Sequence, residues 1–165
     1  MAITRLNNNS ITSITTLPSA IELGSNTPAF LAYLSSNVGI GSGAHQLVPC
    51  DTEVFDTDNC YTNSGNYRFT PNVAGKYFVY AQMRSNESSD FTSFAMEIYK
   101  NGTKYNNTNA SHWHFESPYA GYVIDFNGST DYVDLRCYQD SGSNKSISGS
   151  STERLVFFGA YKLII

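Results

Sequence analysis

The chain has 165 residues, a formal net charge of −4 and only 15% charged side chains, so its polar surface must come largely from Asn, Ser and Thr. This length predicts one domain with a sizeable core. The lack of a Lys- or Arg-rich cluster argues against nucleic-acid binding, and the lack of a long apolar stretch argues against membrane insertion.

Residues 1–27 differ from the rest of the chain and predict an extended N-terminal arm. Ile11, Ile14, Leu17 and Leu23 recur at multiples of three among Asn, Ser and Thr, which are poor helix formers. Such regular apolar residues favour an arm that docks on the surface of another protein. A disordered leader is the alternative.

From residue 28 to residue 165 the pattern predicts a single all-β domain. Apolar and polar residues alternate in short segments, and Asn101-Gly102 and Asn127-Gly128 are common two-residue turn signals. With about eight to ten antiparallel strands, the expected architecture is a jelly-roll or Greek-key β-sandwich. The predicted strands cover residues 30–34, 54–55, 67–69, 75–83, 91–99, 119–126, 132–138 and 155–165.

Two of these strands, 75–83 and 155–165, carry large aromatic rings at both odd-numbered and even-numbered positions. Because successive residues of a strand point to opposite faces, both faces of each strand must be covered. In a small all-β protein one face meets the core, and the other then needs a partner subunit, so the pattern predicts an oligomer. The rings concerned are Tyr77, Phe78, Tyr80, Phe157, Phe158 and Tyr161.

Four segments occur in an order and at spacings that resemble a known family. They are Pro28–Ala32, the aromatic and glycine pattern of Tyr61–Tyr80, Ile98–Gly102 with its Asn-Gly turn, and Phe157–Leu163. Together they make residues 28–165 resemble the globular head of complement component 1q and its relatives in the tumour-necrosis-factor-like superfamily. One departure is that two residues separate Gly128 from Asp131, where the family usually has Gly-Asp.

The resemblance implies a jelly roll that trimerises through one aromatic-rich sheet. It therefore supplies a partner for the strands that are apolar on both faces, namely two further copies of the same chain. The six rings named above are accordingly expected to form the core and the homotrimer interface.

The leader MAITRLNNNSITSITTLPSA resembles openings of short structural proteins of marine tailed bacteriophages. With a trimeric jelly roll and no secretion signal, it implies a virion surface protein made in the cytoplasm of the host bacterium. The leading interpretation is a capsid decoration or cement protein, whose arm binds the major capsid protein or another virion protein. The alternative is a tail-fibre or head-fibre tip that recognises host surface glycans through the loop rings Trp113 and Tyr105. These two rings and Tyr119 could instead pack across a subunit boundary.

Catalytic and metal-binding patterns are sparse. The chain has no G-x-S-x-G or H-E-x-x-H motif, so we expect no enzyme activity and assign no cofactor. His112 and His114 have the spacing to share a metal ion on one strand face, but an exposed loop anchored by Trp113 is the favoured explanation. The acidic residues between positions 51 and 58 lack the ordered spacing of a calcium loop.

Cys50, Cys60 and Cys137 form an odd set without metal-type spacing. Cys137 lies two residues from Leu135 and four from Val133, so its side chain is expected on the same apolar face of the strand, in the core. We favour three free thiols, and a Cys50–Cys60 disulfide in an oxidising medium is the alternative.

Overall fold

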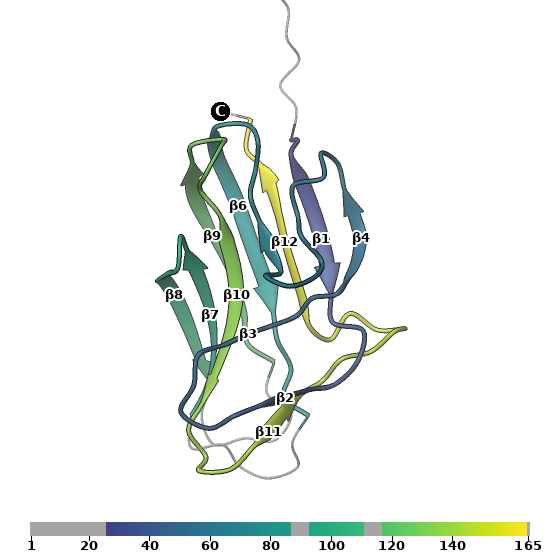
Figure 1. Ribbon diagram of the computed structural model, residues 1–165, viewed down its shortest axis with the longest axis vertical. Helices are drawn as coiled ribbons and strands as arrows, with labels where there is room; N and C mark the ends of the chain where they lie inside the picture. Colours follow the sequence, from purple (N-terminus) through teal and green to yellow (C-terminus); the bar gives the residue numbers. More distant parts are fainter. Residues whose placement is uncertain (1–25, 87–92, 111–116, 165) are drawn as a thin grey trace, which may run out of the picture.

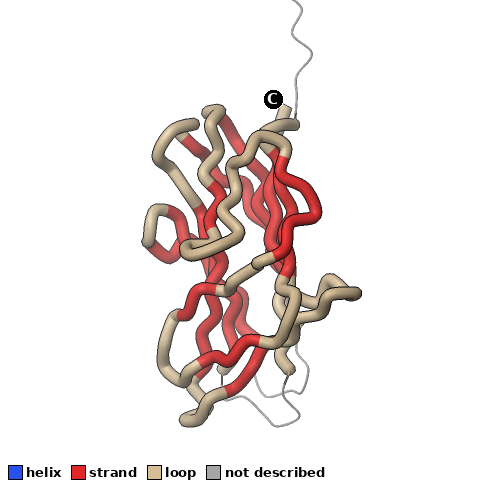
Figure 2. The backbone as a smooth tube through the Cα atoms, turned by 45° about the vertical axis from the view of Figure 1, so that its right-hand side comes forward, coloured by secondary structure: helices blue, strands red, loops and turns tan. Residues whose placement is uncertain are grey.

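The computed structural model describes residues 26–86, 93–110 and 117–164. Every regular element within these ranges is a β-strand, and the strands form the two layers of a β-sandwich (Figure 1). Figure 2 shows the strands running along the length of the molecule, joined by loops. The expected all-β jelly roll is therefore confirmed.

The first sheet has five antiparallel strands. In spatial order they are β4 (Thr52–Asp56), β1 (Ala29–Tyr33), β12 (Phe157–Lys162), β6 (Gly75–Gln82) and β9 (Tyr119–Phe126). β12 is the central strand, paired with β1 on one side and with β6 on the other. The first and last strands of the domain are therefore neighbours, which closes the fold.

The second sheet contains β3 (Gln46–Leu47), β10 (Val133–Gln139), β7 (Phe94–Lys100) and β8 (Thr103–Ala110), and β5 (Arg68–Phe69) also pairs with β10. A short third sheet pairs β2 (Val38–Ile40) with β11 (Lys145–Ile147). β9 and β10 are consecutive in the chain but belong to different sheets, so the turn between them carries the chain from one layer to the other.

The two ends of the sandwich differ. β1 begins and β12 ends at one end, which we call the arm end because residues 1–25 precede it (Figure 1). At the opposite, distal end, Gln82 at the close of β6 is paired with Tyr119 at the start of β9.

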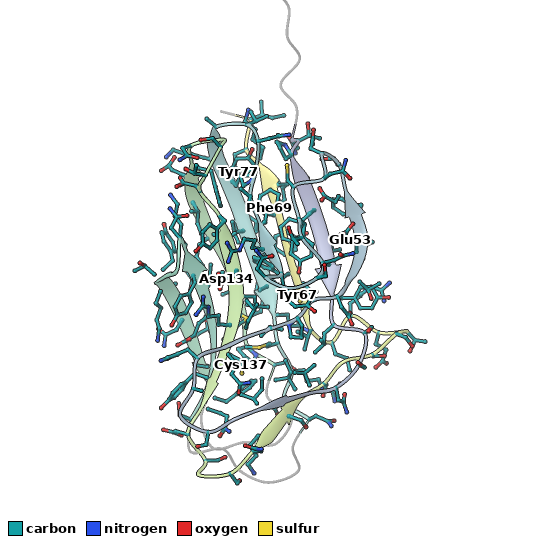
Figure 3. The ribbon with its side chains drawn as sticks, in the orientation of Figure 1. Glu53, Tyr67, Phe69, Tyr77, Asp134 and Cys137 are labelled. Carbon is teal, nitrogen blue, oxygen red and sulfur yellow. The ribbon has the colours of Figure 1, made fainter. Side chains whose placement is uncertain are left out.

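The core lies between the two main sheets and centres on Phe30. Its ring stacks on those of Tyr61 and Phe69, with centroids 4.5 and 4.6 Å apart, and meets Phe158 edge-on at 5.1 Å. Tyr77 is also completely buried, and Figure 3 shows it close to Phe69. Such ring pairs contribute about 0.5–1.5 kcal/mol each beyond the area they bury.

The predicted strands agree best with those of the structure where apolar and polar residues alternate most regularly. β9 coincides with the predicted range 119–126, and β6 begins at the predicted Gly75. Asn101-Gly102 forms the predicted turn between β7 and β8, with positive φ angles of 51° and 76°. These angles match the turn that two-residue hairpins favour.

The predicted strands differ from the structure in several places, and the short strands β2, β3 and β11 were not predicted at all. The predicted strand 67–69 is shorter, because Tyr67 has a φ of 42°, outside the extended region, and β5 starts at Arg68. The sequence pattern also does not predict β8 (Thr103–Ala110), because its sequence TKYNNTNA is almost wholly polar. β8 is an edge strand, where polar residues remain in contact with water.

Ionisation of Tyr77 should weaken the fold at alkaline pH. Burial raises the pKa of this phenol to about 12, whereas an unfolded tyrosine ionises at about pH 10. Between these two values the unfolded chain releases a proton that the folded chain keeps, so the free energy of unfolding falls as the pH rises.

We expect Tyr77→Phe to lower the stability at neutral pH, because the hydroxyl donates a hydrogen bond of 2.7 Å to the Val73 carbonyl. The same substitution should flatten the fall of stability with pH above about pH 10. Urea unfolding across the alkaline range measures both effects. Equal slopes for the two proteins would contradict the expectation.

Candidate functional site

The six rings expected in the core and interface divide between the two sides of the first sheet. Tyr77 and Phe158 are completely buried and point into the core. The other four keep part of their surface exposed and lie at alternate positions of β6 and β12, so they point outward. These four are Phe78, Tyr80, Phe157 and Tyr161.

Tyr119 of β9 joins these four rings in one continuous cluster, which we call the outer aromatic face. Phe78 stacks on Tyr80 with centroids 5.9 Å apart and lies 5.7 Å from Tyr161. Tyr80 is 6.2 Å from Phe157, which is 6.5 Å from Tyr119. The rings form an aromatic layer on the side of the sheet that faces away from the core.

Two glycines allow the rings to lie across the sheet. The strand register places Gly159 on one side of Tyr80 and Gly121 on the other. A Cβ atom at Gly121 would overlap the Phe78 ring, and one at Gly159 would approach Cζ of Tyr80 to 2.6 Å. The rings therefore occupy the space that side chains would fill. Burial in this layer raises the pKa of Tyr80, and neighbouring tyrosines raise it further.

Apolar surface continues from the outer aromatic face to both edge strands of the first sheet. Phe55 on β4, which is paired in register with the outward-facing Leu31, is 44% exposed, and Val123 on β9 is 47% exposed. A polar rim begins at the arm end, where Lys76 Nζ contacts both carboxylate oxygens of Asp125 at 2.6 and 2.8 Å. An apolar centre with a polar rim is the composition of a protein–protein interface.

The outer face of the second sheet, in contrast, pairs its buried charges within the chain. Glu97 on β7 is 1% exposed, and its two carboxylate oxygens lie 2.7 Å from His45 Nδ1 and 2.5 Å from Lys104 Nζ. Asp134 on β10, labelled in Figure 3, is equally buried and lies 2.7 Å from Arg136 Nε. The hydrogen bond to Glu97 raises the pKa of Lys104. A face with internally paired charges does not require a partner.

Tyr105 lies on β8 and not in a loop, which corrects the placement expected from the sequence. Its ring is 48% exposed, and its hydroxyl donates a hydrogen bond of 3.3 Å to the Val123 carbonyl. Tyr105 thus connects an edge of the second sheet to β9 of the first. The other predicted contact residues lie outside the described residues; these are Ile11, Ile14, Leu17, Leu23 and Trp113.

Cys50, Cys60 and Cys137 are buried free thiols, and burial raises the pKa of each of them.

Within residues 26–86, 93–110 and 117–164, no group of three His, Cys, Asp or Glu side chains is placed to hold a metal ion. His112 and His114 fall outside these ranges. The described part of the chain contains no helix long and apolar enough to cross a membrane.

No protein-family model and no curated protein sequence matches the chain. Among solved structures, the PRD1 vertex protein P5 is similar with a TM-score of 0.63 and 14% identity, over 86% of this chain and 100% of that one. The globular domain of the zebrafish complement 1qA protein has a TM-score of 0.60 and 13% identity, over 83% and 97% of the two chains. Murine APRIL has a TM-score of 0.59 and 14% identity, over 82% and 99%. At these identities the likeness establishes the fold, a jelly roll of the tumour-necrosis-factor and complement-1q type.

Glu97→Gln should lower the free energy of unfolding by about 1–3 kcal/mol at neutral pH, because the ion pair with Lys104 would be lost and an amide NH₂ group would replace one acceptor oxygen. The matched control is Glu53→Gln on β4, whose side chain is exposed (Figure 3). It should change stability by no more than about 0.5 kcal/mol. Chemical denaturation measures both values. Equal effects would show that the pairing around Glu97 does not stabilise the second sheet.

Proposed function

We propose that this protein is a homotrimeric virion surface protein that decorates or cements a phage capsid and is anchored by its arm, residues 1–27. The observation that carries the proposal is the outer aromatic face, a layer of rings that a single chain leaves partly exposed. The likeness in fold to the PRD1 vertex protein P5 supports a virion role, and the likeness to the complement 1qA domain supports self-association.

Further copies of the same chain are the occupants that best fit this face. The apolar surface reaches both edge strands, with Phe55 on β4 at one edge and Tyr119 and Val123 on β9 at the other. A closed ring of copies needs two different patches on each copy, one for each neighbour. A two-fold dimer would need only one patch, so two apolar edges favour a closed ring of copies, of which the trimer is the smallest.

The two outer faces then take different environments in the trimer. The outer aromatic face turns toward the three-fold axis, where neighbouring copies remove its rings from water. The second sheet turns toward solvent, where the exposed parts of His45 and Lys104 remain hydrated while they cover Glu97. This orientation leaves the paired carboxylates of the second sheet undisturbed.

Attachment through the arm would give the protein its cementing role. A trimer bound to the assembled shell, and not to free capsid subunits, stabilises the shell by mass action. Three arms on one trimer also act together, because binding of one arm raises the effective concentration of the other two. The apolar residues Ile11, Ile14, Leu17 and Leu23 are the proposed contacts with the major capsid protein.

A second candidate function is the tip of a head fibre or tail fibre that binds host surface glycans. The exposed Tyr105 favours it, because this residue lies on the edge strand β8 of the second sheet and is 48% exposed. Such rings can stack on the apolar faces of sugars. In this case Trp113→Ala would abolish glycan binding by an intact trimer, as measured on a glycan array.

Tyr80→Asp should convert the trimer into a folded monomer. An Asp carboxylate without a partner in an apolar interface costs roughly several kcal/mol. Because Tyr80 points away from the core, the sandwich should keep its circular dichroism spectrum, while light scattering after gel filtration should report the mass of one chain. A trimer that survives this substitution would mean that the interface lies elsewhere.

Two control substitutions separate assembly from folding. Thr103→Asp adds the same charge at an exposed position of β8 and should leave the trimer intact. Phe158→Asp places the charge in the core, where Phe158 is completely buried, and should unfold the chain.

Deletion of residues 1–24 should leave a soluble trimer that no longer binds capsids. The sandwich begins at β1, so the deletion removes the proposed anchor without touching a described strand. Co-sedimentation with undecorated particles measures the binding of the full-length and shortened proteins. Retained binding by the shortened trimer would contradict the anchoring role.

A further inference from the structure

Arg68 on β5 is a cation that the described part of the chain does not neutralise. Its guanidinium lies 3.9 Å from the centroid of the Tyr132 ring, and its Nε atom is buried without a hydrogen-bond partner. Within the described ranges the only other buried side-chain atom of this kind is Ser85 Oγ, which carries no charge. A charged donor is the more costly of the two to leave unpaired.

The carboxylate nearest to Arg68 in the strand register is bound to a different arginine. Asp134, labelled in Figure 3, is paired in register with Arg68, but its Oδ1 atom lies 2.7 Å from Arg136 Nε. Arg136 follows two residues later on the same face of β10, so Arg68 and Arg136 are diagonal neighbours with Cα atoms roughly 7–8 Å apart. The adjacent pair of Glu97 and Lys104 is neutral. This area is therefore locally positive, although the whole chain has a net charge of −4.

Tyrosine rings hold both guanidinium groups in place. The Arg136 guanidinium lies 4.2 Å from the centroid of the Tyr99 ring, much as that of Arg68 lies over Tyr132. Tyr132 is itself fixed by the turn between β7 and β8, because its backbone N–H donates a hydrogen bond of 2.9 Å to Asn101 Oδ1. Arginine side chains that are already ordered lose less conformational entropy when an anion binds.

The two arginines are open to solvent on the outer face of the second sheet. Arg68 and Tyr132 are partly exposed, and 28% of the Arg136 side chain is exposed. The terminal Nη atoms of Arg68 are not enclosed as Nε is, so an oxyanion can reach them. The residues concerned all belong to one chain, so this arrangement does not depend on the proposed trimer.

We propose that Arg68 and Arg136 bind the carboxylate of an acidic sugar on the outer face of the second sheet. The planar fork of a guanidinium matches a carboxylate with two parallel hydrogen bonds. The partly exposed Tyr132 ring provides an apolar surface beside them for the sugar ring. One uncompensated positive charge suits an isolated carboxylate, whereas a phosphate backbone requires several cations.

Isothermal titration calorimetry of the full-length protein at low ionic strength tests this site. The single acidic sugars are glucuronate, galacturonate and N-acetylneuraminate, the polymer is polygalacturonate, and glucose and inorganic phosphate are the controls. We expect an acidic sugar to bind with an affinity that falls as salt is added, and glucose not to bind. Tighter binding of polygalacturonate than of galacturonate, per carboxylate, would identify a polysaccharide as the source of the sugar, and equal affinities would identify the free sugar.

Substitutions identify the residues that bind. Arg68→Met should weaken binding roughly 10- to 100-fold, because charge-assisted hydrogen bonds are lost. Arg68→Lys keeps the charge without the fork, and its affinity should lie between those of Arg68→Met and the wild type. The matched control is Arg154→Met, since Arg154 is exposed and its guanidinium lies 3.7 Å from the centroid of the Tyr33 ring. It should bind as the wild type does.

Stability separates a binding role of Arg68 from a purely structural one. Because Nε is buried without a partner, Arg68→Met should leave the midpoint of urea unfolding unchanged or raise it. A lower midpoint with an unaltered affinity for acidic sugars would show that Arg68 only supports Tyr132, and would overturn the proposal.

Other results would also overturn the acidic-sugar site. These are a wild-type protein that binds none of the acidic sugars, and an equal loss of affinity in Arg68→Met and Arg154→Met. Phosphate that binds as tightly as the acidic sugars would show a general anion site without recognition of a sugar.

Discussion

The pairing of β6 with β12 is the constraint on which the rest of the structure depends. Both strands carry rings on both faces, so one hydrogen-bonded ladder supports the core through Tyr77 and Phe158 and the outer aromatic face through Phe78 and Tyr80. A shift of either strand by one residue would exchange its inward and outward side chains. The register therefore determines the stability of the sandwich and the chemistry of its outer surface together.

The glycines of the first sheet are part of the same constraint. Gly159 and Gly121 lie beside Tyr80 in the register, and Cβ atoms at these positions would meet the Tyr80 and Phe78 rings. The rings can spread across the sheet only because these positions lack side chains. An aromatic layer that lies close to the sheet would let another protein surface approach the strands more closely than side chains projecting from it would.

The two outer faces of the sandwich differ in chemistry. On the second sheet, Glu97 and Asp134 are buried but paired with Lys104 and Arg136 of the same chain. On the first sheet, the apolar layer has no such internal complement among the described residues and gains by contact with another surface.

Much of the fold was predictable, because alternation in strands such as 119–126 and the Asn101-Gly102 turn are local properties of the chain. β8 was not predictable, since its polar sequence takes part in the second sheet only through pairing with β7. Parity within β6 shows that Tyr77 and Phe78 face opposite sides, but local pattern alone does not say which side is the core. Tyr119 joins the outer aromatic face only through pairing with distant strands.

By itself, the sequence determined that the domain is a β-sandwich and that two of its strands need cover on both faces, because these properties follow from the two-residue period of a strand. The tertiary structure decided which rings form the core, which glycines accommodate the outer rings, and that the arm starts beside β12. These features depend on register and on contacts between segments far apart in the chain, such as Asn26 with Lys162, which no local pattern encodes.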